Sequence, residues 1–223
     1  MCGRFALSVA PQALFESFHV QPLPGLKPRY NIAPTQLVAA VLRPDAQSDR
    51  QMQWLQWGLI PPWAKDPKMG ARMINARSET VLEKPSFRAP FRRQRCLIPS
   101  DGFFEWKEDP GGKQPVFICK QDRSPFAFAG LWESWAKEGQ IIYSCTILTT
   151  QANELLKPLH ERMPVILQAR DYEQWLDPSL NEPAPLLPLL VPHPAEGWVG
   201  FAVNRAVNNA KNDSPECIQP LVS

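Results

Sequence analysis

Hydrophobic positions in this chain gather in short runs, rich in aromatic and β-branched residues, with proline, glycine and polar residues between them. Runs of this length and composition predict β-strands rather than long helices. Hairpin-length loops such as 108–112 favour antiparallel pairing of neighbouring strands. The expected strands are Leu37–Leu42, Met52–Leu59, Gly102–Lys107, Val116–Lys120, Phe126–Trp132, Ile141–Thr149, Pro164–Leu167 and Trp198–Val203.

Helical patterns are fewer and shorter. The spacing of apolar residues predicts a helix over Pro11–Phe18, with Ser8 as a candidate N-cap. Further short helices are expected at Thr150–Leu156 and Ala169–Leu176. Because strands outnumber helices and lie close together, we expect an α/β (α+β) fold in one domain over residues 1–223. Mostly antiparallel sheets would curl into a barrel-like core with short peripheral helices.

Proline is unusually frequent, at 25 of 223 residues, roughly twice the usual ~5%. Most prolines alternate with apolar runs, which indicates rigid, shaped loops rather than disorder. They concentrate only between Glu182 and Pro194, and that stretch also holds four leucines. We therefore interpret it as a packed surface excursion and not as a linker.

The cysteines indicate the cellular compartment. There are five, an odd number, with no C-x-x-C pair, which argues against a disulfide framework or a zinc ribbon. Reduced thiols are typical of cytoplasmic proteins, and no apolar run approaches the ~20 residues of a membrane span. We therefore expect a cytoplasmic protein with no membrane partner, no metal and no cofactor.

Charge is uneven along the chain although the formal net charge is only +2. The segment from Lys65 to Arg95 holds nine basic and three acidic residues, with Trp63, Phe87 and Phe91 beside or among them. Phosphate contacts from cations, combined with aromatic stacking, suit a sequence-tolerant single-strand binder. The alternative is a solvated basic edge whose aromatic side chains face the core.

The second residue is a cysteine, and it becomes the N-terminus when Met1 is removed. Its α-amine and thiol have reference pKa values of about 7.7–8.0 and 8.5, so both nucleophiles are partly available near neutrality. Such a 1,2-aminothiol condenses with an aldehyde, because the amine forms an imine and the thiol then closes a thiazolidine ring. The alternative is that Cys2 only packs as a small hydrophobic residue.

Three polar residues interrupt apolar surroundings. Glu105 lies among aromatic residues, where a carboxyl should have a raised pKa and could act as a general acid; alternatively it lies on the polar face of a strand. His160 precedes an expected strand and could shuttle protons, or serve structure. Asn75 could orient a substrate through its amide, or shape a turn.

Together these residues belong to six segments that occur in a fixed order. They are Met1–Phe5, Arg29–Pro34, Trp57–Trp63, Ile74–Glu79, Gly102–Trp106 and His160–Pro164. This set resembles the SOS-response-associated peptidase (SRAP) family, whose members include proteins that crosslink to abasic DNA. The match extends from Cys2 to the segment 207–212, which is essentially the whole chain.

The resemblance implies roles for the reactive residues. Cys2 would form a thiazolidine with the ring-opened aldehyde of an abasic site in single-stranded DNA, and this adduct would shield the lesion. Asn75 would hold the sugar and the N-terminal region, and Glu105 would open the deoxyribose as general acid and base. His160 would assist ring opening and reversal of the adduct.

The resemblance also implies how the DNA is held. Arg77 and Arg162, with Arg4 and Trp63, would contact phosphates and stack against the strand near the lesion. The expected partner is single-stranded DNA with abasic sites at replication forks, bound by a monomer. Ala64 departs from relatives that carry a second Trp there, which puts a two-ring wedge in doubt.

Two other classes of protein stay open. A cysteine peptidase or N-terminal-nucleophile hydrolase would use Cys2 for acyl chemistry, with His160 as base and Asn75 as orienting group. Removal of Met1 by the protein itself would be a limited form of that activity. A non-covalent single-stranded-DNA-binding module would leave Cys2 incidental.

Overall fold

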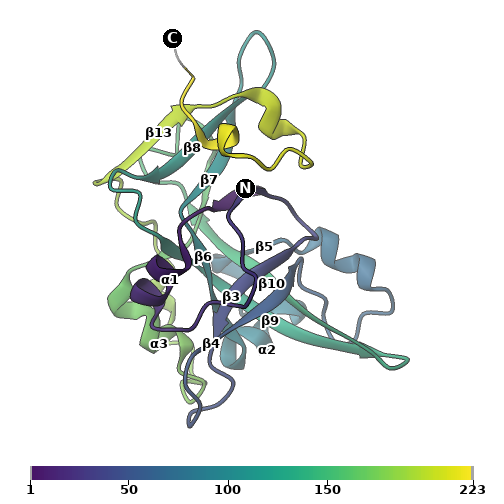
Figure 1. The fold of residues 1–223 in the computed structure, drawn as a ribbon. Helices are drawn as coiled ribbons and strands as arrows, with labels where there is room; N and C mark the ends of the chain where they lie inside the picture. Colours follow the sequence, from purple (N-terminus) through teal and green to yellow (C-terminus); the bar gives the residue numbers. More distant parts are fainter. Residues whose placement is uncertain (1, 222–223) are drawn as a thin grey trace.

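The strands of the computed structural model, which describes residues 2–221, follow the short apolar runs of the sequence (Figure 1). Their bounds are β1 (Phe5–Leu7), β2 (Arg29–Ile32), β3 (Leu37–Leu42), β4 (Gln51–Trp57), β5 (Asn75–Arg77), β6 (Arg95–Ser100), β7 (Gly102–Lys107), β8 (Gln114–Lys120), β9 (Phe126–Lys137), β10 (Gln140–Gln151), β11 (Arg162–Pro164), β12 (Ile166–Leu167) and β13 (Trp198–Ala202). The α-helices are α1 (Pro11–Phe18), α2 (Pro85–Arg93) and α3 (Tyr172–Leu176). Short 3₁₀ turns lie at Pro67–Arg72, Ser78–Thr80, Ala169–Asp171, Leu187–Leu189, Arg205–Asn208 and Pro215–Ile218.

The larger sheet closes into a ring. Strands β10, β4, β3, β6 and β9 are hydrogen-bonded neighbours in that order, and β9 pairs back onto β10. Every pair in the ring is antiparallel except β4 with β10. Closure leaves no unpaired edge within the ring, and it confirms the expected barrel-like core.

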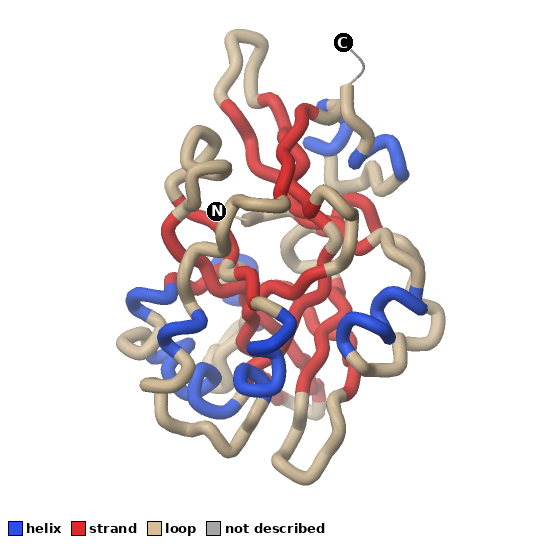
Figure 2. Tube along the Cα trace, turned by 90° about the vertical axis from the view of Figure 1, so that its left-hand side faces the viewer, coloured by secondary structure: helices blue, strands red, loops and turns tan. Residues whose placement is uncertain are grey.

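The second sheet contains the N-terminal strand. Its order is β13-β8-β7-β1-β2, so β1 lies between β7 and β2. The hairpin that joins β7 to β8 projects from the top of the molecule in Figure 1, and Figure 2 shows the same hairpin and the barrel below it from the side. Phe5 of β1 packs edge-on against Trp57 of β4, with ring centroids 5.2 Å apart, which joins this sheet to the barrel.

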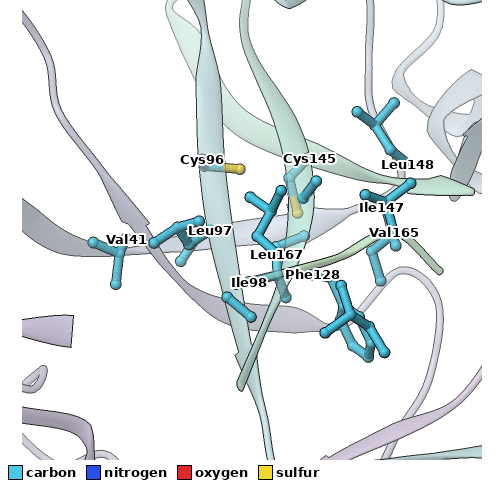
Figure 3. Close-up of a cluster of buried hydrophobic side chains, with 14 of the residues drawn as sticks. Val41, Cys96, Leu97, Ile98, Phe128, Cys145, Ile147, Leu148, Val165 and Leu167 are labelled. Carbon is cyan, nitrogen blue, oxygen red and sulfur yellow. The ribbon is translucent and has the colours of Figure 1, made fainter. Parts of the chain in front are cut away.

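Buried hydrophobic side chains cover both faces of the barrel strands. Figure 3 shows part of this core, where the fully buried Val41 and Leu97 lie on one face, and Phe128 and Ile147 of the next two strands lie on the other. Helix α1 adds to this core from outside through Phe18, whose ring stacks on Tyr172 of α3 at 5.6 Å. Within residues 2–221, no helix has the length and apolar character needed to cross a bilayer.

Two expectations about helices are wrong. The segment Thr150–Leu156 is not a helix, because Thr150 pairs with Met163 and so continues β10, and turns follow it. Ser8 does not cap α1; the N-cap is Ala10, and the Ser8 side chain instead binds Asp101. In both places a tertiary partner overrides the local pattern.

The basic segment from Lys65 to Arg95 is only partly available for binding. Phe91 is fully buried against Trp175, and Phe87 packs against the core. Arg95 is 3% exposed. The alternative in which aromatic side chains face the core therefore holds for these two phenylalanines, whereas Trp63 is 56% exposed.

Arg95 should be essential for stability rather than binding. Its guanidinium donates to the carbonyl oxygens of Phe91, Arg92, Trp175 and Asp177, which ties α2 and α3 to β6. Arg95→Met would leave these buried acceptors unsatisfied, and we expect a loss of about 3 kcal/mol in the free energy of unfolding. Urea denaturation measures it, with the exposed Arg93→Met as control; an equal effect in both variants would contradict this role.

Gly58 and Gly70 allow two backbone segments to approach each other closely near the exposed Trp63 in sequence. Gly58 directly follows β4 with φ of +131°, and a Cβ there would lie 2.5 Å from the carbonyl oxygen of Gly70. Only glycine fits this approach without displacing backbone. The contact holds the 3₁₀ turn Pro67–Arg72 against the start of the loop that carries Trp63.

Candidate active site

Cys2 enters the second sheet just before β1, and its side chain is fully buried. The thiol donates to the carbonyl oxygen of Arg4 at 4.0 Å. Burial raises the pKa of the Cys2 thiol well above its usual range, and the nearby charge of Glu105 raises it further. The sulfur is therefore held as a thiol, within electrostatic reach of Glu105.

Asn75 fixes the position of Cys2 from the barrel side. Strand β5 pairs in parallel with β10, with Asn75 opposite Ile147. The Asn75 Nδ2 group donates to the Cys2 carbonyl oxygen at 2.8 Å. Its Oδ1 is buried and accepts no hydrogen bond from the part of the chain that the structure describes.

Glu105 reaches the same region through strand pairing. Phe5 of β1 lies opposite Phe103 of β7, and continuing this antiparallel register puts Gly3 opposite Glu105. Glu105 is only 3% exposed, so its assignment to a solvated strand face is wrong. Burial raises the pKa of this carboxyl, which favours a group that retains its proton closer to neutrality.

His160 has one defined tautomer. The main-chain N–H of Arg162 donates to His160 Nδ1 at 2.9 Å, so in the neutral ring Nε2 carries the proton. Burial lowers the pKa of the imidazole. His160 therefore offers Nε2–H as a hydrogen-bond donor in its neutral form.

A pocket of about 510 Å³ brings Glu105 and His160 together beside the N-terminal segment. Its lining residues are Gly3, Arg4, Glu105, Trp106, Lys113, His160 and Asn208. Sequence reasoning did not select Trp106, Lys113 or Asn208 as site residues. Trp106 directly follows Glu105, and Asn208 falls in the C-terminal segment 207–212 of the family match, so both had a signal in the sequence.

Arg4 lines this pocket but is also held in place. Its Nη1 donates to Asn31 Oδ1 and to the Val207 carbonyl oxygen, both at 2.7 Å, and its guanidinium lies 5.9 Å from the Trp106 ring centroid. Asn31 is fully buried and donates to carbonyl oxygens of the segment 207–212. Arg4 thus joins the N-terminal segment to the C-terminal wall of the pocket.

The other expected DNA-contacting residues do not line this pocket. Arg77, at the end of β5, is exposed, and Trp63 follows β4 in an exposed loop. Arg162 forms a bidentate ion pair with Glu79, at 2.6 and 2.9 Å. Within residues 2–221, no cluster of His, Cys, Asp or Glu has the arrangement of a metal site.

A buried carboxyl and a neutral imidazole donor thus line one pocket beside the N-terminal segment, in a fold built on a closed β-barrel. The family model described as SOS response associated peptidase (SRAP) matches residues 1–210. The chain therefore belongs to the SRAP family.

Curated relatives and solved structures agree with this assignment. The abasic site processing protein YoqW of Bacillus subtilis (strain 168) is 45% identical over 98% of this chain and 99% of its own. The abasic site processing protein HMCES of Gallus gallus is 32% identical over 99% of this chain and 78% of its own. A crystal structure of a Bacteroides thetaiotaomicron protein superposes with a TM-score of 0.87 at 27% identity, covering 99% of this chain and 100% of that one.

Proposed function

We propose that this protein traps abasic sites in single-stranded DNA as a covalent crosslink through Cys2, after Met1 is removed. The proposal is carried by the surroundings of Cys2: Asn75 binds its carbonyl oxygen, Glu105 lies within electrostatic reach of its thiol, and Glu105 and His160 line one pocket beside the neighbouring Gly3. The relatives named as abasic site processing proteins add support, because the similarity to them spans nearly the whole chain.

The chemistry follows from the groups present. The closed sugar of an abasic site is a hemiacetal: Glu105 would donate a proton to its ring oxygen as the bond from that oxygen to C1 breaks, and the C1 hydroxyl would lose its proton to water, which leaves the aldehyde. The Cys2 amine adds to the aldehyde carbon, and loss of one water leaves an imine. The Cys2 S–H then adds across the C=N bond: sulfur bonds to carbon and the proton goes to nitrogen, which closes the thiazolidine.

The remaining polar groups suit the opened sugar. Ring opening creates a hydroxyl donor, and the buried Asn75 Oδ1 is an acceptor without a partner in the described chain. The Nε2–H of neutral His160 can donate to an oxygen of the sugar, and it can return a proton when the adduct reverses. Neither step requires a metal or a cofactor.

The cysteine-peptidase alternative has less support. A thiol peptidase needs a thiolate, activated by a neighbouring imidazole. Here burial raises the pKa of the Cys2 thiol, the thiol donates to the Arg4 carbonyl oxygen, and His160 Nδ1 is occupied by the main chain of Arg162. Whether Met1 is removed is a separate question, which the mass of the purified N-terminus answers.

Single-stranded DNA is the proposed partner because a lesion must leave the base stack to enter the pocket, and unstacking is cheapest in a single strand. Arg77 would bind a phosphate near the lesion, and Trp63 would stack on a base. The chain would act at replication forks, where single strands are exposed.

Trp63→Ala should weaken binding to intact single-stranded DNA about tenfold, because one base–aromatic stacking contact contributes about 1–3 kcal/mol. Fluorescence anisotropy with a labelled oligonucleotide measures this affinity. Trp54→Ala removes another exposed tryptophan, which lies outside the six ordered segments, and serves as control. Equal losses in both variants would argue against a specific stacking role for Trp63.

The direct test compares protein of verified N-terminal mass on two oligonucleotides that differ only in one abasic site. We expect a denaturation-resistant product with the abasic strand alone, with the mass of protein plus DNA less one water. Protein that retains Met1 should give none. A product of equal yield with intact DNA would refute the proposal.

A further inference from the structure

One ion pair links the two segments that carry Asn75 and His160. Glu79 lies in the 3₁₀ turn Ser78–Thr80, directly after β5, and Arg162 is the first residue of β11. Arg162 Nη1 donates to Glu79 Oε1 at 2.6 Å, and Nη2 donates to Oε2 at 2.9 Å. This parallel, two-bond geometry is the most directional form of an Arg–carboxylate pair.

The same guanidinium also spans the strand between those segments. Its Nη2 donates to the main-chain carbonyl oxygen of Thr149 at 2.7 Å. Thr149 belongs to β10, where it lies opposite Arg77 of β5 on one side and Pro164 of β11 on the other. We call Glu79, Thr149 and Arg162 the Glu79 clasp, because together they join β5, β10 and β11.

The clasp acts on His160 through the main chain. Arg162 makes both contacts: its side chain pairs with Glu79, and its main-chain N–H donates to His160 Nδ1. The Arg162 side chain is only 16% exposed, and Glu79 is the acidic partner of its guanidinium. If Glu79 were lost, the guanidinium would be free to turn toward solvent or DNA. The start of β11 would then lose its side-chain contact with the turn after β5.

We propose that Glu79 is a positioning residue for the crosslinking reaction, which holds Arg162 so that its N–H keeps His160 in the Nε2–H tautomer within the pocket. The expected effect of Glu79 on the crosslinking rate rests on the proposed function. Glu79 does not touch the reacting atoms; it acts through Arg162. The competing idea is that the Glu79 carboxylate only occupies the place of a DNA phosphate on Arg162.

The test uses Glu79→Gln, which keeps the side-chain shape and removes the charge that orders the pair. Glu83→Gln is the matched control, since Glu83 is an exposed glutamate four residues further on. Three quantities are measured: the ¹⁵N imidazole spectrum of His160, the single-turnover crosslinking rate, and the affinity for intact single-stranded DNA. Thermal unfolding confirms that each variant is folded.

For Glu79→Gln we expect His160 to lose the single Nε2–H signature and exchange between tautomers. The crosslinking rate should fall about tenfold or more, on the scale that misplacement of a reacting group costs. Affinity for intact DNA should stay equal or rise. In an Arg162→Met background, Glu79→Gln should cause no further loss of rate, because Glu79 acts through that side chain.

A wild-type tautomer signature and rate in Glu79→Gln would overturn the inference. A rate that changes only in proportion to DNA affinity would also overturn it, in favour of the phosphate-like role. If the wild-type protein forms no crosslink, the proposed function fails; the ¹⁵N spectrum then still decides whether Glu79 positions His160.

Discussion

Cys2→Ala should abolish the stable adduct with abasic single-stranded DNA. The variant still presents an N-terminal amine once Met1 is removed, so an imine can form, but no thiol can close the ring. Because the covalent nucleophile is lost, we expect the yield of denaturation-resistant product to fall by about a thousandfold or more. Denaturing electrophoresis of protein mixed with abasic and intact oligonucleotides measures this yield.

Two companion variants separate chemistry from packing. Cys217→Ala removes another buried thiol and should crosslink like the wild type. Cys2→Ser keeps the amine and the shape of the side chain, so its imine should accumulate and be trapped by borohydride. An undiminished adduct in Cys2→Ala would show that a different residue is the nucleophile.

Glu105→Gln should slow crosslinking about 100-fold near neutral pH, the usual contribution of a general acid. In the wild type the reacting state needs a Cys2 amine without its proton and a Glu105 that retains its own, so the rate should rise from low pH and fall again in a limb at high pH, which gives a bell-shaped profile. Because burial raises the pKa of Glu105, more molecules hold this pair of protonation states at the start of the falling limb than an ordinary glutamate would allow. In the variant this limb should disappear, so the residual rate should only rise with pH.

Rapid-quench kinetics between pH 5 and 9 measure this profile. Glu108→Gln provides the control, since Glu108 is a solvent-exposed glutamate in the same β7–β8 hairpin. It should retain both limbs. A bell-shaped profile that survives in Glu105→Gln would assign the acid to another group.

The fold was predictable where a strand or helix has a self-contained pattern. Leu37–Leu42, Gly102–Lys107 and Pro11–Phe18 have the predicted bounds. Strands β5 and β6 were missed: β5 has only three residues and exists through its pairing with β10, and β6 contains Pro99. Helix α2 was missed as well, because Pro90 lies within it and arginines dilute its apolar face.

The sequence selected the candidate residues but none of their contacts. The ordered segments selected Cys2, Asn75, Glu105 and His160, whose catalytic roles stay predictions; in the structure Asn75 binds the Cys2 carbonyl oxygen, and Glu105 and His160 line one pocket. The sequence could not show that Arg4 is held by Asn31 or that Arg162 is paired with Glu79. Those contacts join residues far apart in the chain, and no local spacing encodes them.

The burial of Cys2 should protect its thiol from oxidation before the protein meets DNA. Oxidants attack thiolates rather than thiols, and this thiol is fully buried with a raised pKa. Each crosslink occupies one protein molecule until the adduct reverses, so the proposed reaction depends on an intact nucleophile in every molecule. A shielded thiol would keep each molecule able to react.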